Sequence, residues 1–251
     1  RFNNDIGTRA EQHQRETYRI VAGARGNVGD NWNYDVFFNY GRTETYYETG
    51  GNVDIQKFNR AANAVRNGAG QIVCRVNADA ITTNDDPSCR PINLFGENAP
   101  ATTPDGVAYV LYTSSRRQWH EQINAAAVLS GDTGAFFELP GGPIGMAFGA
   151  EFRSEDYFSA YDDFTKGEYA PGQSNTFLNA FADSNPRAVT SYEGFAEVRV
   201  PVLRNMPFFH DLTLAASGRV SKYNIYDDPQ WTWSVGGSWA PVRDISFRVN
   251  F

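Results

Sequence analysis

The groups in this chain that could carry chemistry are scattered along it and do not form recognised motifs. The histidines His13, His120 and His210 are far apart in sequence, and neither cysteine belongs to a pair separated by two residues. The glycine string around Gly218 is not followed by a helical pattern, as a phosphate-binding loop requires. The Gly-x-Ser-x-Gly sequence of serine hydrolases is also missing. We therefore expect no catalytic residue, no metal site and no cofactor.

Carboxylates and guanidiniums are nevertheless numerous in the segments where polar and apolar residues alternate. Opposed charges of this kind could form a catalytic dyad. We favour a solvated wall in which the charges pair with one another, because the alternation places all of them on one polar face. The residues concerned are Glu151, Arg153, Glu155, Glu193, Glu197, Arg199, Arg219 and Arg248.

Aromatic residues are frequent between these segments, where rings could stack on a sugar or on an aromatic chelator. Packing within loops and anchoring at a membrane interface explain many of them equally well. As ligand-binding residues we single out Tyr109, Tyr112, Tyr161 and Tyr169.

Cys74 and Cys89 lie in one stretch that is rich in Asn, Asp, Gly and Pro. Little else in such a stretch could order the backbone, so we predict a disulfide between them. The bridge would add about 3 kcal/mol on the chain-entropy model and requires an oxidising compartment. The alternative is two unrelated free thiols.

Strands must position the polar groups, because apolar and polar residues alternate with a period of two in eight segments. Every second residue from Tyr192 to Val202 belongs to the apolar face, for example, and so does every second residue from Trp231 to Trp239. The predicted strands are 16–27, 32–47, 116–130, 144–158, 192–202, 212–220, 231–239 and 245–251.

The length and the composition of these segments predict an all-β, antiparallel transmembrane β-barrel. A tilted strand crosses a bilayer in about ten residues, and aromatic residues near strand ends suit the two membrane interfaces. The mean hydropathy of −0.49 is compatible with this, because polar lumen residues and loops dilute the apolar face. No apolar run is long enough for a membrane helix. A net charge of −7 argues against nucleic acid as a partner.

The connections between the strands differ in length. Outer-membrane barrels have short periplasmic turns and longer extracellular loops. Short or compact joins occur at 28–31, 131–143, 203–210 and 241–244. We therefore expect the extracellular connections to be the long ones at 48–115 and 159–188, together with the short join at 227–230, which breaks the contrast.

The longest connection has a helical pattern of its own. Ile55, Phe58, Ala62 and Val65 follow Asp54, which is a suitable N-cap, at helical spacing. Gly68 is the expected stop. A second short helix is expected near 105–112. The pattern favours an ordered lid over a disordered loop.

Several strings in the chain resemble those of TonB-dependent outer-membrane receptors, and they occur in the order typical of that family. Two of them, Leu129-Ser130-Gly131-Asp132 and Trp239-Ala240-Pro241, lie at strand ends. The remaining strings are 70–75, 89–96, 139–143, 149–153 and 192–197, and the resemblance extends over about 16–251.

The resemblance implies a barrel of about 22 strands with an N-terminal plug inside it. It also implies a TonB box that contacts the energy-coupling TonB complex, and import of a scarce nutrient such as a siderophore, cobalamin or a glycan fragment. The location implied is the outer membrane of a Gram-negative bacterium. Residues 1–251 include no plug and no TonB box, so we expect a slice of such a receptor. Its partners would be membrane lipid, the remaining strands and plug, the TonB complex, and a small-molecule or oligosaccharide ligand.

Two other interpretations fit the alternation. Eight strands suffice for a small self-contained outer-membrane barrel with a structural or binding role. The charged residues of the lumen face argue against it, since the interior of such a barrel is just filled by side chains. A soluble lectin-like β-sandwich would also alternate, but its turns should recur every 8–12 residues.

Overall fold

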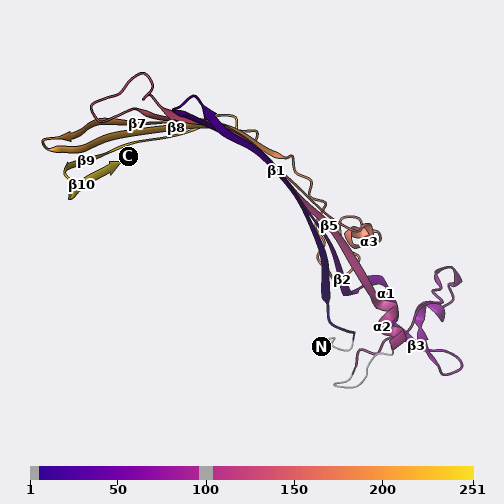
Figure 1. Ribbon diagram of the computed structural model, residues 1–251. Coiled ribbons are helices and arrows are strands. Elements are labelled where there is room, and N and C mark those ends of the chain that lie inside the picture. The colour runs from indigo at the N-terminus through magenta and orange to yellow at the C-terminus, as the bar shows by residue number, and fades with distance from the viewer. Residues whose placement is uncertain (1–5, 96–103) are drawn as a thin grey trace. The chain divides into compact units, whose positions relative to one another are not determined.

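Eight strands form one sheet in the computed structural model, which describes residues 6–95 and 104–251 (Figure 1). The sheet order is β1-β2-β5-β6-β7-β8-β9-β10, and every strand pair whose register is resolved in it is antiparallel. All eight predicted strands are confirmed, and most are longer than the alternation indicated. Their bounds are β1 Ala10–Val28, β2 Trp32–Val53, β5 Leu111–Asp132, β6 Gly145–Tyr161, β7 Val189–Met206, β8 Phe209–Tyr223, β9 Gln230–Val242 and β10 Ile245–Asn250.

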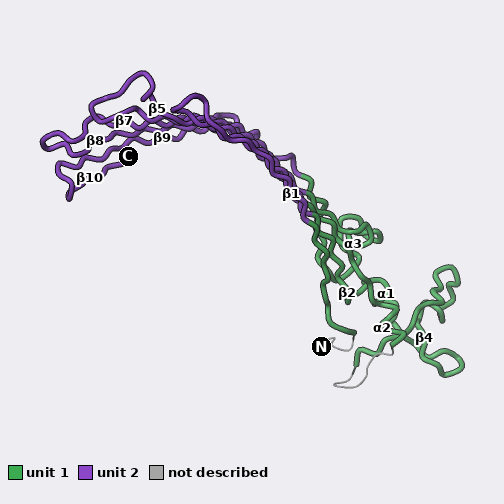
Figure 2. Tube along the Cα trace, in the orientation of Figure 1, with its two compact units in different colours: residues 1–16, 44–119, 158–185 green, residues 17–43, 120–157, 186–251 purple. Residues whose placement is uncertain are grey.

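The chain divides into two compact units, coloured separately in Figure 2. Unit 1 comprises 1–16, 44–119 and 158–185, which include the two long connections. Unit 2 comprises 17–43, 120–157 and 186–251. Strands β7 to β10 belong to unit 2, whereas β1, β2, β5 and β6 contribute residues to both.

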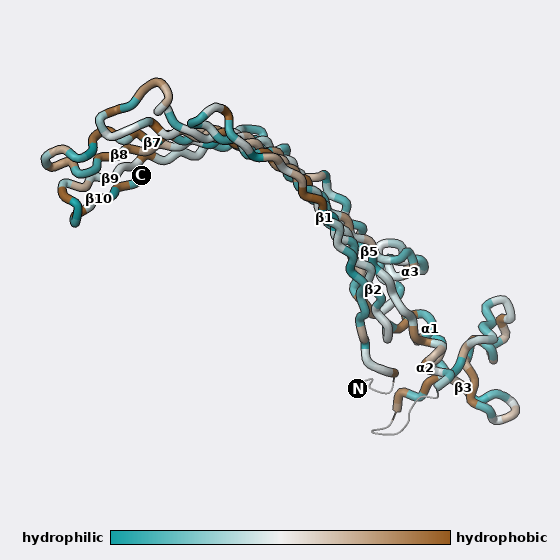
Figure 3. The backbone as a smooth tube through the Cα atoms, in the orientation of Figure 1, coloured by the Kyte–Doolittle hydropathy of each residue, from teal (hydrophilic) through white to brown (hydrophobic). Residues whose placement is uncertain are grey.

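The strand registers of unit 2 confirm the predicted faces. Ala216 of β8 lies opposite Val235 of β9, and it also lies opposite Val198 of β7. The next apolar neighbours, Gly218 and Trp233, are paired in the same way. Brown and teal residues are accordingly mixed along these strands in Figure 3. The apolar side chains of this face remain open, and Trp231 is 72% exposed.

One predicted position on the apolar face is wrong. The alternation places Val202 there, but the register between β7 and β8 shifts between Pro201 and Leu203. Proline has no N–H to donate to the ladder, so it favours a β-bulge, which inserts one extra residue. Val202 is that extra residue. Leu203, opposite Leu212, takes the next place on the apolar face.

The long connection between β2 and β5 is ordered over its described residues. Helix α1 (Ile55–Ala62) begins at Asp54, whose carboxylate accepts hydrogen bonds from the amides of Gln56 and Lys57 at 2.9 and 3.0 Å. This confirms the predicted N-cap. The other short elements are β3 Ala64–Arg66, β4 Ile72–Cys74, the 3₁₀ turns η1 Arg75–Asn77 and η2 Thr82–Asn84, and helices α2 Pro104–Val110 and α3 Asp163–Gly167.

The predicted helix stop at Gly68 is wrong, because α1 already ends at Ala62. The chain turns into β3, which pairs with β4 in a small hairpin, and Gly68 lies in the turn between them. The second predicted helix is found as α2, but it ends at Val110, so Tyr112 belongs to β5.

A small buried core holds these elements together in unit 1. Ala61 and Val110 are fully buried, and helices α1 and α2 meet there. The other buried members are Ile6, Cys74, Cys89, Ile92 and Tyr109. Over its described residues, the structure contains no helix with the length and apolarity that a membrane crossing would require.

Candidate ligand-facing surfaces

The polar face of the unit 2 sheet carries paired charges. Glu151 of β6 and Glu193 of β7 lie directly opposite each other, an arrangement that like charges make unfavourable. Each carboxylate has its own cation. Arg153 contacts Glu151 at 3.1 Å along the same strand, and Arg219 contacts Glu193 at 3.2 Å from β8. The predicted pairing across strands therefore holds for Arg219, whereas Arg153 pairs within its strand.

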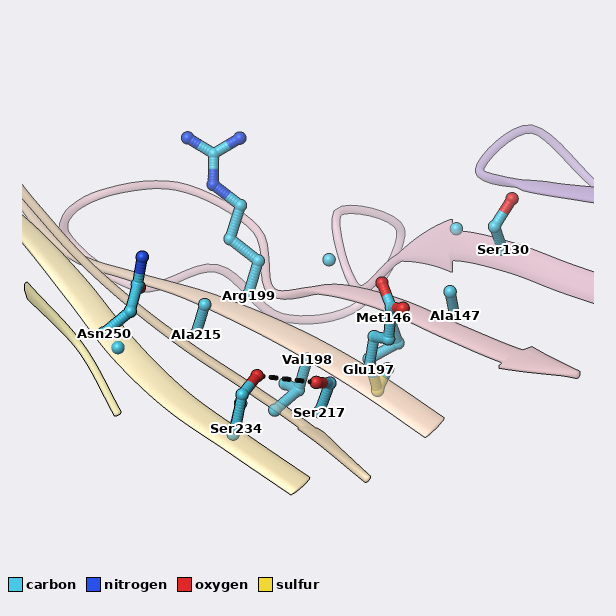
Figure 4. A pocket seen from close by; sticks show the side chains of 14 residues that line it. Ser130, Met146, Ala147, Glu197, Val198, Arg199, Ala215, Ser217, Ser234 and Asn250 are labelled. Carbon is cyan, nitrogen blue, oxygen red and sulfur yellow. Dashed lines mark hydrogen bonds between the residues drawn. The ribbon is translucent and has the colours of Figure 1, made fainter. Parts of the chain in front are cut away.

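A hollow of about 510 Å³ lies on unit 2 (Figure 4). Figure 4 shows Arg199 and Asn250 rising from the strands on one side, and a hydrogen bond of 2.8 Å joins the hydroxyls of Ser217 and Ser234. The hollow forms because the side chains that line much of it are small and leave the backbone uncovered. The small residues are Gly145, Ala147, Ala215, Ser217, Ser234 and Gly236. The surface suits contact with water, a polar solute or another protein segment.

The four tyrosines predicted to bind a ligand have different neighbours in unit 1. Tyr109 is only 8% exposed, and its hydroxyl donates to Asp86 at 2.6 Å. Tyr112 donates to Asp162 at 2.8 Å, and its ring lies 4.4 Å from that of Phe164.

Tyr169 is 43% exposed and meets Phe164 edge-on at 5.2 Å. Tyr161 lies at the end of β6, with the guanidinium of Arg116 at 5.6 Å from its ring centroid. Phe164 thus links Tyr112 and Tyr169, while Tyr109 and Tyr161 belong to other clusters. Ligand binding by the four tyrosines stays a prediction.

Asp86 is the polar centre of the disulfide-bonded loop. Its carboxylate accepts hydrogen bonds from Tyr109, from Arg60 at 3.3 Å, and from both the amide and the hydroxyl of Ser88. Burial alone would raise the pKa of Asp86, but these hydrogen bonds and the Arg60 charge outweigh it and hold the pKa below its ordinary value. Burial and the Asp86 carboxylate raise the pKa of Tyr109, so this phenol stays protonated.

Asp162 plays the same part beside helix α3. It accepts from the amides of Ser115 and Thr165 and from two hydroxyls, those of Tyr112 and Thr165. Burial would raise the pKa of Asp162, yet these donors lower it. The carboxylate therefore ties β5 to the connection that follows β6.

The predicted disulfide is confirmed, because Cys74 and Cys89 are bonded with their Cα atoms 6.3 Å apart. Cys74 ends strand β4, and both sulfurs belong to the buried core of unit 1. The bridge closes the segment that contains Asp86.

One cluster in unit 1 was not anticipated from the sequence. Arg116 of β5 lies over the ring of Tyr47 of β2 at 4.1 Å, and His13 of β1 contacts the same ring at 5.8 Å. The alternation did contain a signal, since Arg116 shares its face with Gln118 and His120, which were assigned to the lumen. Tyr47 could not be matched to Arg116 without the strand pairing across a long connection.

The comparison with known families decides the identity. The family described as TonB dependent receptor-like, beta-barrel matches residues 1–251. The chain belongs to the TonB-dependent receptor family. No curated protein matches the chain. The soluble β-sandwich interpretation is therefore wrong, and the resemblance recognised from the short strings is confirmed.

Membership accounts for the two faces of the unit 2 sheet. TonB-dependent receptors are outer-membrane receptors and transporters, so the open apolar face with Trp231 and Val235 suits lipid. The opposite face with Glu193 and Arg219 suits the polar barrel interior. Among the described residues, no group of three or more His, Cys, Asp or Glu side chains is arranged to hold a metal ion.

Proposed function

We propose that the polypeptide carrying this chain imports a scarce nutrient across the outer membrane of a Gram-negative bacterium, with energy supplied through the TonB complex. The ligand class is a siderophore, cobalamin or a glycan fragment. In this proposal residues 1–251 form barrel wall, and 48–115 and 159–188 are extracellular loops that receive the ligand.

The observation that carries the proposal is the order built into the connection between β2 and β5. A loop that only joins two strands has no need of a helix, a hairpin, a disulfide and a half-buried aspartate that accepts hydrogen bonds from its neighbours. Loops of this length in compact proteins are uncommon unless they serve a function. A rigid loop loses less conformational entropy when it binds a ligand, which favours ligand capture.

The other partners follow from the same arrangement. Lipid would cover the apolar face, and further strands and a plug would complete the barrel, because an unpaired strand edge is costly inside a membrane. The TonB complex would act through a TonB box outside residues 1–251. The net charge of −7 gives phosphate backbones no attraction, so nucleic acid is not among the partners.

Growth assays test this proposal directly. The intact polypeptide would be returned to a strain that lacks it, with or without functional TonB, and growth would be scored on an iron siderophore, cobalamin or an oligosaccharide as limiting nutrient. We expect growth on one of these that requires both the polypeptide and TonB. Equal growth without TonB would indicate passive diffusion and contradict the proposal.

A matched pair of variants tests the loop tyrosines. Tyr169→Ala should weaken uptake at limiting ligand, whereas Tyr226→Ala should not, because Tyr226 is similarly exposed but lies in the short connection between β8 and β9. Equal losses in both variants would remove the specific role proposed for Tyr169.

A further inference from the structure

Arg116 is half-buried. Its Nε atom is inaccessible to water and has no hydrogen-bond partner in the part of the chain that the structure describes. Among the described residues no carboxylate forms an ion pair with the side chain. A half-buried guanidinium normally finds a carboxylate or several acceptors, because taking a charge out of water is otherwise costly. The Nε atom is closed to a ligand as well as to water, so the donors that a ligand could reach are those of the two Nη groups, for which the described residues supply no acceptor either.

Aromatic rings flank Arg116 on both sides. Tyr47 comes from β2 and Tyr161 from β6, the two strands adjacent to β5 in the sheet. The guanidinium carbon lies 4.1 Å from the ring centroid of Tyr47 and 5.6 Å from that of Tyr161. Cation–π contacts with rings on two strands limit the movement of the guanidinium, but they supply no anion for its N–H donors.

We propose that Arg116, Tyr47 and Tyr161 form a binding subsite for a small ligand that carries a carboxylate on a flat carbon skeleton. The planar fork of a guanidinium matches two carboxylate oxygens, and the phenol rings can pack against a flat group beside the charge. The subsite deepens the proposed import function and rests on it for its biological meaning. It specifies the chemistry of one part of the ligand.

The same cluster could instead be a purely structural clamp between three strands. A clamp needs the ring contacts and the positive charge, whereas a carboxylate site also needs the fork. Arg116→Lys separates the two, because lysine keeps the charge but presents a single ammonium with no bidentate geometry.

The test measures binding of a simple probe to the intact polypeptide in detergent by saturation-transfer NMR, which detects weak ligands. The probe is benzoate, and benzamide is the uncharged control of the same shape. We expect benzoate to bind at least about tenfold more tightly than benzamide, because its hydrogen bonds are charge-assisted. Arg116→Gln should abolish the preference and Arg116→Lys should reduce it.

Arg117→Gln is the matched control. It removes the same charge one residue further along β5, where the alternation places the side chain on the opposite face. It should leave benzoate binding unchanged. Thermal unfolding of each variant reports whether the barrel is intact. Equal binding of benzoate and benzamide, or equal loss in the Arg116 and Arg117 variants, would overturn the subsite.

The growth assay and the NMR assay have separate outcomes. TonB-dependent growth without a benzoate preference would leave the import proposal standing and remove the subsite. A benzoate preference that depends on Arg116, without TonB-dependent growth, would leave a carboxylate site in a protein whose import role had failed.

Discussion

The sheet of unit 2 and the loop elements of unit 1 obtain order in different ways. In unit 2, large apolar side chains are exposed; Trp231 and Val249, for example, are each 72% exposed. The strands are held together by the backbone hydrogen bonds between them. In unit 1, Val110 and Ala61 are fully buried, and a disulfide and two aspartates connect the elements around them.

The difference follows from the surroundings of each part. A barrel wall has one face for lipid and one for the lumen, so its apolar side chains are covered by the membrane. A loop in water has no such cover and must bury its own apolar residues or be cross-linked. Substitutions in the two regions should therefore fail for different reasons, and the following experiments test that difference in order of expected effect.

A charge on the apolar face of unit 2 should have the largest effect. Val235 lies near the middle of β9, so Val235→Arg would place a guanidinium in lipid at a cost of about 2–4 kcal/mol. We expect the protein not to assemble in the outer membrane. The measurement is the amount of protein in outer-membrane fractions that shows heat-modifiable mobility in gels.

Ser234→Arg is the control, one residue away on the polar face. This variant loses the hydroxyl contact with Ser217, which is worth about 1 kcal/mol. The guanidinium that it introduces stays in water. We expect normal assembly. Equal failure of the two variants would show that the two faces of the sheet are assigned incorrectly. It would also contradict the view that lipid covers the apolar side chains of unit 2.

Loss of the disulfide should affect unit 1 alone. Replacing Cys74 and Cys89 with serine opens a loop with a sequence separation of 15 residues, which removes about 3 kcal/mol on the chain-entropy model. Limited proteolysis should then cut between residues 64 and 90, while the heat-modifiable mobility of the barrel is kept. Unchanged protease resistance would mean that the small core is sufficient without the bridge.

Two glycines probe the backbone packing that orders unit 2. A Cβ at Gly141 would lie 2.3 Å from the carbonyl oxygen of Pro201, at the bulge in β7, whereas Gly218 has no atom within 4 Å of its Cβ position. Gly141→Ala should cost about 1–3 kcal/mol because backbone must move, and Gly218→Ala less than about 0.5 kcal/mol. Urea unfolding in detergent measures both. Similar midpoints for the two variants would contradict the close approach.

The strands and the disulfide could be predicted because their signals are local. An alternation with a period of two identifies a strand without knowledge of its neighbours, and the cysteines lie in one polar stretch. The N-cap at Asp54 is equally local. The bulge at Pro201 was missed because one inserted residue leaves the alternation on either side intact, although proline itself was a signal.

The remaining features depend on contacts across long connections. Glycine is a common residue at helix ends, which made Gly68 a reasonable prediction. The helix ends earlier because the chain continues into β3, which pairs with β4. The hydrogen bond from Tyr109 to Asp86 and the contact of Tyr47 with Arg116 join residues that only the folded chain brings together. An aromatic residue in a loop therefore predicts a ligand contact poorly, because its neighbours decide whether it is buried.

Acid should weaken the unit 1 loop slightly, through the carboxylate of Asp86. The pKa of Asp86 in the folded protein lies below its ordinary value of 3.8, so the ionised carboxylate stabilises the loop above that pH. This contribution is lost as the pH falls from 3.8 through the lower pKa of the folded state. Hydrogen exchange of the amides of η1 and η2 should therefore speed up, relative to the intrinsic rate, between about pH 4 and pH 2. Asp86→Asn should start with weaker protection and lose this pH dependence, because its amide cannot ionise. An unchanged acid response in Asp86→Asn would assign the effect to another carboxylate, with Asp162 the next to replace.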